Sequence, residues 1–389
     1  MFFTEAKSKK VSIILAIVVI SLAVFGCVMV YSASSYSANV VYGDSKHFLT
    51  KQIIGVCIGV ASMIGFSFFD YHKLKKLALP ILCVGIVLLI VVLIPGIGVE
   101  NYGARRWIRL PGFTIQASEI SKFCYIVFTA AYLSKSRDKI KTFKGILPIC
   151  IFGGIICVLI LMEPNMSITI CTGLVMLTML FVGGISLKHF LMICIPAVCL
   201  VPVLIIIEPY RLKRLLAFID PWANPKGEGY QLVQSLYSLG SGGLFGVGLF
   251  NSRQKYLFLP FAESDFIFAI ICEELGFIGV LGLITLFIII LICGIKIAKS
   301  ADCLFGAYLA TGITALISIQ VLVNIAVVTG SIPPTGLPLP FISAGSSSLI
   351  VLMSAIGILL NIAKNKGETC YVKTLKLKKV KSVFSHSDA

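Results

Sequence analysis

The sequence is short of charged residues, and of acidic residues in particular. Only 13% of its 389 residues are charged, whereas 58% are hydrophobic and the mean hydropathy is +1.00. A soluble domain carries about a quarter charged residues, so this chain lacks the polar surface needed to face water on all sides. The shortage excludes an ordinary soluble domain and indicates a protein that lies largely within a membrane.

Histidine is scarce, and the cysteines form no usable pattern. The four histidines are scattered and do not have zinc-site spacing. The thirteen cysteines lie in or beside apolar runs, apart from Cys370 near the end, so no disulfide framework is predicted. Lys and Arg total 33 against 17 Asp and Glu, a net charge of +16. In a membrane protein this excess favours basic loops on anionic lipid over nucleic-acid binding.

Long apolar runs are what the chain has in quantity. About twenty apolar residues cross the hydrocarbon layer as a helix. Ten runs are predicted to do so: about 11–32, 49–69, 78–95, 117–134, 146–162, 166–184, 189–208, 265–295, 304–329 and 347–363. The short gap "MEPNMS" leaves open a re-entrant pair for the fifth and sixth. The sequence therefore predicts an all-α, polytopic membrane protein, with a single integral domain over 1–363 and a basic cytoplasmic tail over 364–389.

Basic residues predict the orientation. They precede the first run, follow the second and fourth, recur at Lys188, Lys296 and Lys299, and fill the tail. With ten spans all of these segments fall on one side, which the positive-inside tendency assigns to the cytoplasm. We expect both termini inside, at the plasma membrane. Segments 100–119, 209–264 and 330–348 are then outside. Segment 209–264 is a large loop between spans seven and eight. Because long loops tend to carry function, we expect the chemistry on this outer side.

Asp265 stands where polar "ESD" meets the apolar run "FIFAII". In one alternative, Ser264 or Asp265 is the N-cap of the following helix. In the other, Asp265 is a general base, which requires nearby cations and limited water. Glu273 and Glu274 follow eight and nine residues later. Carboxylates buried in a span count as functional by default, although pairing with another helix is an equal alternative. The helical repeat prevents all three from facing one pocket.

Cationic side chains crowd the predicted outer face. "GARRWI" sets Arg106 beside Trp107, which suits either bidentate phosphate binding or an Arg–Trp belt at the interface. "ASEISK" places Glu119 and Lys122 one helical turn apart, either as an ion pair or with Lys122 directed into an outer cavity. Segment 209–264 adds Arg211, Lys213, Arg214, Lys226, Arg253 and Lys255. Its "GSGGLFGVG" lacks the Lys-Ser/Thr ending of a nucleotide loop, so flexible turns are predicted there.

Together these motifs resemble the SEDS family of shape, elongation, division and sporulation proteins. The matching runs are "GARRWI", "QASEISK", "MEPN", "FIDPWANPKGEGYQLVQSLYSLGSGGLFGVGL", "NSRQKYLFLP", "DFIFAIICEELGFIGV" and "TGLPLPFISAGSSS". The resemblance covers essentially the whole chain and is closer to the division and sporulation branch (FtsW and SpoVE) than to the RodA branch. It implies a peptidoglycan glycosyltransferase that polymerises lipid II into glycan strands at the outer membrane face.

The resemblance also implies roles for residues and partners. Asp265 is implied to be catalytic, and substrate binding is assigned to Arg106, Trp107, Glu119, Lys122, Arg214, Arg253, Lys255 and Ser343. The chemistry agrees, because a pyrophosphate leaving group needs cations and the acceptor C4 hydroxyl needs a base. A divalent cation (Mg²⁺ or Mn²⁺) is left open, although no ligand cluster is visible. The implied partners are lipid II, a class B penicillin-binding protein and other division or sporulation proteins.

The chain departs from the family pattern at several positions. Phe261 stands where the family usually has Glu, and Phe250 where it usually has Gly; Ala117, Asn165, Ala344 and Ser346 are further departures. The lost carboxylate near Asp265 leaves open a weak or inactive paralogue. Two other functions are also open, a lipid II flippase and a non-catalytic scaffold for a penicillin-binding protein. Outward cations around one carboxylate favour the enzyme.

Overall fold

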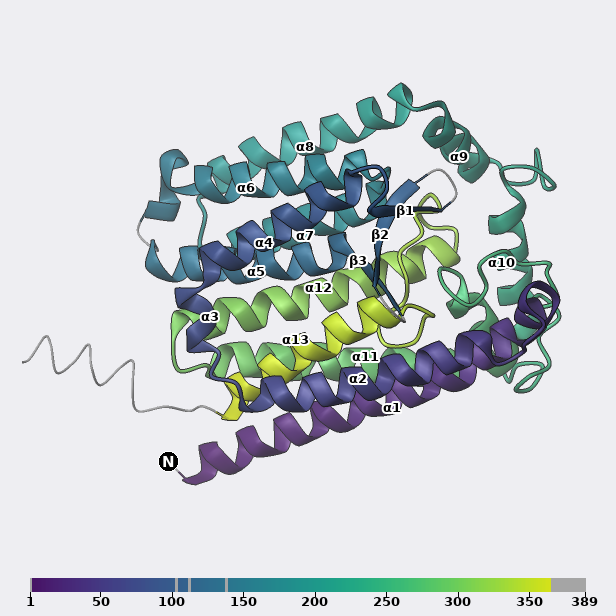
Figure 1. Ribbon diagram of the computed structural model, residues 1–389, viewed down its shortest axis with the longest axis horizontal. Helices are drawn as coiled ribbons and strands as arrows, with labels where there is room; N and C mark the ends of the chain where they lie inside the picture. The colour runs from purple at the N-terminus through teal and green to yellow at the C-terminus, as the bar shows by residue number, and fades with distance from the viewer. Residues whose placement is uncertain (1, 102–103, 111–112, 137–138, 365–389) are drawn as a thin grey trace, which may run out of the picture.

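Long helices lying side by side make up most of the molecule. The computed structural model describes residues 2–101, 104–110, 113–136 and 139–364. A small sheet and most of the irregular segments gather at one end of the helices, on the right in Figure 1. Short connections rich in lysine occupy the other end. The predicted tail, 364–389, lies outside the described residues apart from Lys364.

The helices correspond to the ten predicted runs. They are α1 (Phe2–Tyr42), α2 (His47–Phe68), α4 (Ala78–Leu93), α5 (Ala117–Lys135), α6 (Phe143–Met162), α7 (Met166–Gly183), α8 (Leu187–Ile207), α11 (Ile267–Ser300), α12 (Leu304–Val328) and α13 (Ser346–Lys364). Among the described residues, eight of these are long and apolar enough to cross a membrane. Helix α4 is a shorter apolar helix, and α5 is in neither group. The prediction of a polytopic, helical membrane protein is confirmed. By length, α6 and α7 are two crossing helices rather than a re-entrant pair.

A three-stranded antiparallel sheet interrupts the helical pattern between α4 and α5. It consists of β1 (Gly98–Asn101), β2 (Ala104–Leu110) and β3 (Phe113–Gln116), with β2 in the middle. The sequence predicted only an irregular loop at 100–119, which was wrong here. The strands are short and β2 is rich in arginine, so they give no hydropathy signal. The sheet leads directly into α5 and thereby fixes Arg106 at the loop-bearing end.

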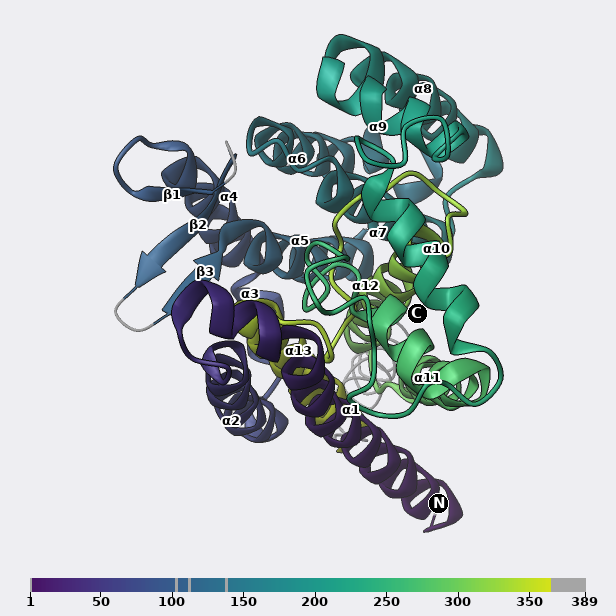
Figure 2. The ribbon, with the colours of Figure 1, turned by 90° about the vertical axis from the view of Figure 1, so that its right-hand side faces the viewer.

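The long segment 209–264 is partly helical. It contains α9 (Pro209–Ile219) and α10 (Tyr230–Gly242), which lie at the same end as the sheet (Figure 1), the end that faces the viewer in Figure 2. Two other short helices, α3 (His72–Lys76) and η1 (Lys139–Lys141), lie in lysine-rich connections at the opposite end. The three segments predicted to share one face, 100–119, 209–264 and 330–348, therefore do gather together.

The core is built around α12, which packs against α5, α7 and α11. Close approach there requires a small residue: a Cβ on Gly312 would come within 2.5 Å of Ile126. Helix α13 packs along α2 and α1. The start of α1 and the end of α13 lie at the same end of the molecule (Figure 1), as an even number of crossings requires. By contrast, α8 lies at the edge, and none of its side chains is fully buried.

Helix α11 is broken at Gly276, whose φ of 63° and ψ of −167° are not helical. The sequence predicted one continuous helix from residue 265, which was wrong. Segment 243–248 fills the break, so the backbone groups freed there are paired, as burial in an apolar setting demands. The closing bonds are Val247 N to Glu273 O (2.9 Å), Gly248 N to Glu274 O (3.0 Å), Phe277 N to Gly243 O (3.0 Å) and Ile278 N to Leu244 O (3.2 Å).

Candidate active site

Asp265 lies in the turn that leads into α11. The helix begins at Ile267 with Phe266 as its N-cap, and no side chain accepts a capping hydrogen bond. The alternative in which Ser264 or Asp265 caps the helix is therefore wrong. The Asp265 side chain is half-buried and is available for another role.

Three successive backbone carbonyls hold this turn in place. The bonds are Ala344 N to Glu263 O (2.8 Å), Ser343 Oγ to Ser264 O (2.7 Å) and Asn324 Nδ2 to Asp265 O (2.9 Å). Asn324 also donates to Leu337 O at 2.7 Å, which ties α12 to segment 337–344. The backbone of Asp265 is thus fixed from two elements while its carboxylate is left unengaged.

Burial and neighbouring charges shift the pKa of the Asp265 carboxyl group. Burial raises its pKa to about 6, while the charges of Arg214 and Arg106 lower the pKa and that of Glu263 raises it further. Among the described residues, no donor is hydrogen-bonded to this carboxylate. Gly336 lies beside it, since a Cβ there would sit 3.0 Å from Asp265 Oδ2. At neutral pH the group is mostly ionised yet remains a competent base.

The two arginines reach this place from distant segments. Arg106, on β2, donates from Nε to Glu163 O (3.1 Å) and from Nη2 to Pro164 O (2.5 Å). Arg214, on α9, donates to Pro334 O (3.4 Å), and its guanidinium lies 4.6 Å from the centre of the Tyr210 ring. The structure therefore brings Arg106, Arg214 and Asp265 together, as the sequence predicted. These backbone contacts leave donors of both guanidinium groups for an anion.

Trp107 and the Glu119–Lys122 pair are arranged differently. Trp107 follows Arg106 on β2, so the two side chains project from opposite faces of the sheet. Lys122 Nζ lies 2.8 Å from Glu119 Oε1, and both side chains are only 1% exposed. Ser348 on α13 donates to the other Glu119 oxygen at 3.2 Å. The ion-pair alternative is confirmed, and Lys122 is buried within the bundle rather than open to the outer face.

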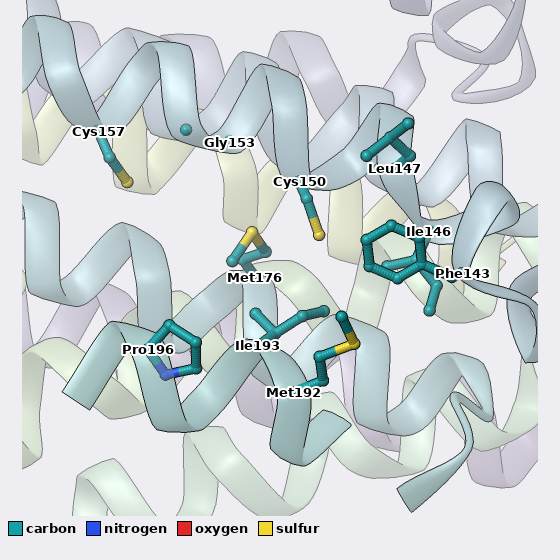
Figure 3. A pocket seen from close by; sticks show the side chains of 11 residues that line it. Phe143, Ile146, Leu147, Cys150, Gly153, Cys157, Met176, Met192, Ile193 and Pro196 are labelled. Carbon is teal, nitrogen blue, oxygen red and sulfur yellow. The ribbon is translucent and has the colours of Figure 1, made fainter. Parts of the chain in front are cut away.

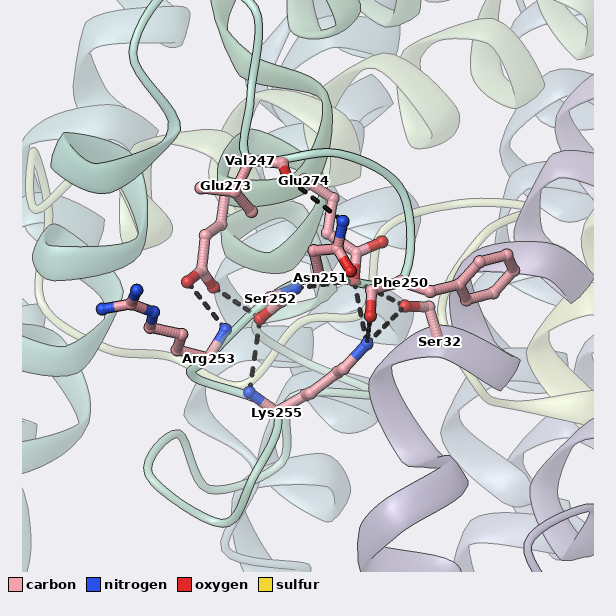
Figure 4. A network of polar contacts seen from close by, with 9 residues as sticks. All are labelled: Ser32, Val247, Phe250, Asn251, Ser252, Arg253, Lys255, Glu273 and Glu274. Atoms are coloured by element: carbon pink, nitrogen blue, oxygen red, sulfur yellow. Dashed lines mark hydrogen bonds and ion pairs between the residues drawn. The ribbon is translucent and has the colours of Figure 1, made fainter.

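Lys255 is also engaged inside the protein (Figure 4). Its Nζ lies 3.3 Å from Glu274 Oε1 and 3.4 Å from Ser32 Oγ on α1, and it donates to Phe250 O at 2.5 Å. Ser32 donates to the same Glu274 oxygen at 2.6 Å. Glu274 thus pairs with another helix, which is one of the two alternatives given above for Glu273 and Glu274. Lys255 acts here as a structural clamp between α1, the loop and α11.

Glu273 holds the neighbouring part of the same loop. Its carboxylate accepts hydrogen bonds from Ser252 Oγ and from Arg253 N, the latter at 2.9 Å. The Arg253 side chain is exposed, and its guanidinium points away from this network (Figure 4). Ser343 is buried and uses its hydroxyl to accept from Leu339 N and donate to Ser264 O. Of Arg253, Lys255 and Ser343, only Arg253 has an exposed side chain, and it places a positive charge on the loop-bearing surface.

Two residues of the site were missed by sequence reasoning. Glu163, buried beside Arg106, follows an apolar run within "MEPN", which the sequence indicated only as a short gap between spans and a family motif. Asn324 is an amide inside a long apolar helix, and that position alone is a signal of function. Its role depends on tertiary contacts with Asp265 and Leu337, which no local pattern encodes.

An apolar cavity of about 330 Å³ lies between α6, α7 and α8 (Figure 3). It is lined by Phe143, Ile146, Leu147, Cys150, Gly153, Gly154, Cys157, Met176, Met192, Ile193 and Pro196. None of the residues around Asp265 lines it. Its chemistry suits an apolar chain, not a reacting group.

The fold and site define a polytopic membrane protein that carries a half-buried carboxylate within the electrostatic reach of two arginines at its loop-bearing end. This setting suits an anionic substrate. The chain belongs to the FtsW/RodA/SpoVE family, whose model, described as "Cell cycle protein", matches residues 12–368. The resemblance read from the motifs is confirmed.

Similar proteins cover nearly the whole chain. It is 43% identical over 352 residues to the probable peptidoglycan glycosyltransferase FtsW of Trichlorobacter lovleyi, covering 90% of this chain and 92% of that protein. It is 40% identical over 366 residues to the stage V sporulation protein E of Bacillus subtilis, covering 92% and 98%.

Solved structures share the fold. One is a chain from "Structural coordination of polymerization and crosslinking by a peptidoglycan synthase complex", with a TM-score of 0.76, 25% identity and coverage of 91% of this chain and 98% of that chain. Another is the rod shape determining protein RodA of Thermus thermophilus, with a TM-score of 0.68, 24% identity and coverage of 91% and 97%. The helical arrangement described above is therefore that of the family.

Proposed function

We propose that this protein, a peptidoglycan glycosyltransferase of the FtsW/RodA/SpoVE family, polymerises lipid II with Asp265 as general base. One observation carries the proposal. The backbone of Asp265 is fixed by Asn324, while its carboxylate lies within the electrostatic reach of Arg106 and Arg214. A base that is held still, partly shielded from water and flanked by cations is what sugar transfer from a pyrophosphate requires.

In the proposed reaction Asp265 accepts the proton of the acceptor C4 hydroxyl as that oxygen bonds to the anomeric carbon of the donor. The bond from the anomeric carbon to the pyrophosphate breaks, and the polyprenyl pyrophosphate leaves with the electron pair. Arg106 and Arg214 offset the negative charge that grows on the leaving group. Trp107 and Arg253 contact the substrate from the same end of the molecule.

The other predicted substrate-binding residues act from a distance. Lys255 and Ser343 shape the loops that carry the site, through Glu274 and Ser264 respectively. The Glu119–Lys122 pair stabilises the packing of α5 beneath the sheet. A divalent cation that shares the pyrophosphate charge with the arginines is compatible with this scheme. The polyprenyl tail lies against apolar helix surface, with the cavity between α6, α7 and α8 available to it.

We place the loop-bearing end on the outer face of the plasma membrane and both termini in the cytoplasm. Lysine-rich connections such as 72–76 and 139–144 at the opposite end support this orientation. We further propose a class B penicillin-binding protein as partner, together with other division or sporulation proteins. The fold shared with a chain of a peptidoglycan synthase complex supports that partner.

The deciding experiment is polymerisation of labelled lipid II by the purified protein, with and without a class B partner, read as glycan strands on a gel. Asp265→Asn keeps the shape of the side chain but loses its basicity, so we expect a rate loss of about 100-fold or more with lipid II binding retained. The matched control is Asp220→Asn, an exposed carboxylate of the same outer segment. Normal polymer from a folded Asp265→Asn protein contradicts the assignment. Binding without polymer from the wild type points instead to a flippase or a scaffold.

A further inference from the structure

The turn between α6 and α7 contains a buried carboxylate that the proposed mechanism does not use. The Glu163 side chain is 0% exposed, and among the described residues neither of its carboxylate oxygens has a hydrogen-bond partner. The Ser118 hydroxyl is likewise without a hydrogen-bond partner among the described residues, but its proximity lowers the pKa of Glu163. An ionised carboxylate left unpaired inside a protein is strongly disfavoured, so this site favours the neutral acid.

Glu163 is linked to the site through Arg106. The Arg106 guanidinium donates to the backbone oxygens of Glu163 and Pro164, and its charge acts on both Glu163 and Asp265. The same cation therefore acts on two carboxyl groups, the buried one of Glu163 and that of the proposed base. A charge on Glu163 would compete with Asp265, and with a bound pyrophosphate, for this guanidinium.

We propose that Glu163 is a positioning residue that must be neutral for Arg106 to serve the substrate. In the neutral state Arg106 stays on the two backbone carbonyls and faces the Asp265 side of the site. Once ionised, Glu163 draws the guanidinium toward its own carboxylate and away from the pyrophosphate. This inference rests on the proposed function, because it assigns Arg106 to the leaving group.

The surrounding charges support a switch within the working range of pH. Burial raises the pKa of Glu163 to about 8, against a smaller opposing effect of Arg106 and Ser118. The groups that face Arg106 are Tyr210 and Arg214 from α9, Glu163 from the α6–α7 turn and Asp265 from the turn before α11. Between about pH 6 and pH 8 Asp265 is ionised while Glu163 is neutral. Above that range the protein loses the neutral form of Glu163.

The test compares initial polymerisation rates and lipid II affinities of wild type and Glu163→Gln across pH. Gln mimics the neutral acid and cannot ionise. One pH unit above its pKa, about a tenth of Glu163 stays neutral. The variant-to-wild-type ratio of both quantities is therefore expected to rise about tenfold between about pH 7 and about pH 9. The matched control is Glu228→Gln, because Glu228 is an exposed glutamate of the outer segment. Its variant-to-wild-type ratio should not change with pH.

Two further variants, Ser118→Ala and Glu163→Asp, test the role of Glu163 independently of Glu163→Gln. Ser118→Ala removes a hydroxyl that lowers the pKa of Glu163, so it should move the alkaline loss to higher pH even if Glu163→Gln does not fold. Two outcomes overturn the proposal. One is a Glu163→Gln to wild-type ratio that stays flat with pH for both rate and affinity. The other is a Glu163→Gln protein that fails to bind lipid II at every pH, together with a Glu163→Asp protein that binds it. If wild type binds lipid II without making polymer, the proposed function fails, while the pH dependence of binding still decides the role of Glu163.

Discussion

The side-chain amide of Asn324 donates one hydrogen bond to the carbonyl oxygen of Asp265 and a second to that of Leu337, at 2.9 and 2.7 Å. Through this amide α12 sets where the proposed base stands. Asn324→Ala removes both bonds and leaves buried carbonyls unpaired, so we expect a loss of roughly 1–3 kcal/mol in stability and a lower kcat. Asn224→Ala, at an exposed site of the outer segment, should change neither. Thermal unfolding and polymerisation rates measure the two effects, and an unchanged kcat in a folded Asn324→Ala protein contradicts the positioning role.

The acid side of the pH–rate profile should report Asp265. Because its pKa is raised to about 6, the rate should fall about tenfold per pH unit below that value as the base becomes protonated. Arg214 is the charge that lowers this pKa most, so Arg214→Gln should move the acid limb to higher pH. Lys213→Gln, its exposed neighbour on α9, should leave the limb in place. A limb that stays put in Arg214→Gln shows that another group limits the rate at low pH.

Both phenylalanines that depart from the family pattern have left-handed backbone, with φ of 65° at Phe250 and 56° at Phe261. Position 250 therefore has a backbone conformation that glycine would adopt without strain. Glycine removes a strain of about 1–2 kcal/mol, so Phe250→Gly should raise the unfolding temperature. Phe258→Gly is the matched control, because Phe258 is exposed but has no positive φ. An unfolding temperature that falls equally in both variants contradicts the strain.

The same two positions bear on activity. A glutamate at 261 would add negative charge near Asp265 and raise its pKa, or contact the acceptor sugar. We therefore expect the Phe250→Gly, Phe261→Glu double variant to polymerise lipid II faster than wild type, which is expected to have low intrinsic activity. Initial rates with the same partner and lipid II concentration decide this. Equal rates show that both positions are neutral in this chain.

The buried Lys255–Glu274 pair should matter more for stability than any exposed pair. Lys255→Met strands the Glu274 charge and should cost about 3–5 kcal/mol, whereas adding Glu274→Gln should restore most of it. The partly exposed Arg105–Glu100 pair is the comparison, and Arg105→Met should cost less than about 1 kcal/mol. Thermal unfolding in detergent distinguishes these cases. A double variant no more stable than Lys255→Met alone shows that the hydroxyl and backbone contacts of Lys255 carry the effect.

The orientation is tested by labelling. In a cysteine-free background, a membrane-impermeant thiol reagent should modify a cysteine introduced at Lys226 in intact cells but not one introduced at Lys76. These positions lie at opposite ends of the helices. The reverse pattern places Asp265 on the cytoplasmic side.

The helices were predictable because each depends on a long apolar run, which local composition reveals. The sheet at β1–β3 and the break at Gly276 were not, because they are stabilised by partners remote in sequence. For the site, the resemblance assigned roles to Asp265, Arg106 and Arg214 among others, and these three lie within electrostatic reach of one another. It could not show that Lys122 and Lys255 are buried in ion pairs, since a lysine at the end of an apolar run looks the same whether it faces water or a carboxylate.

The exposed edge helix α8 has a consequence for the membrane itself. Its 21 residues extend about 31 Å at helical rise, close to the thickness of the hydrocarbon layer, and none of its side chains is fully buried. Acyl chains therefore cover more of α8 than of the packed helices, so we expect bilayer thickness to affect its tilt most. In a thinner bilayer we expect the tilt of α8 to increase while the spacing of the packed helices stays the same. The width of the cavity that α8 shares with α6 and α7 should then change. Spin-label distances between α6 and α8 in nanodiscs of different acyl length would register that dependence, which makes lipid composition a determinant of what the cavity admits.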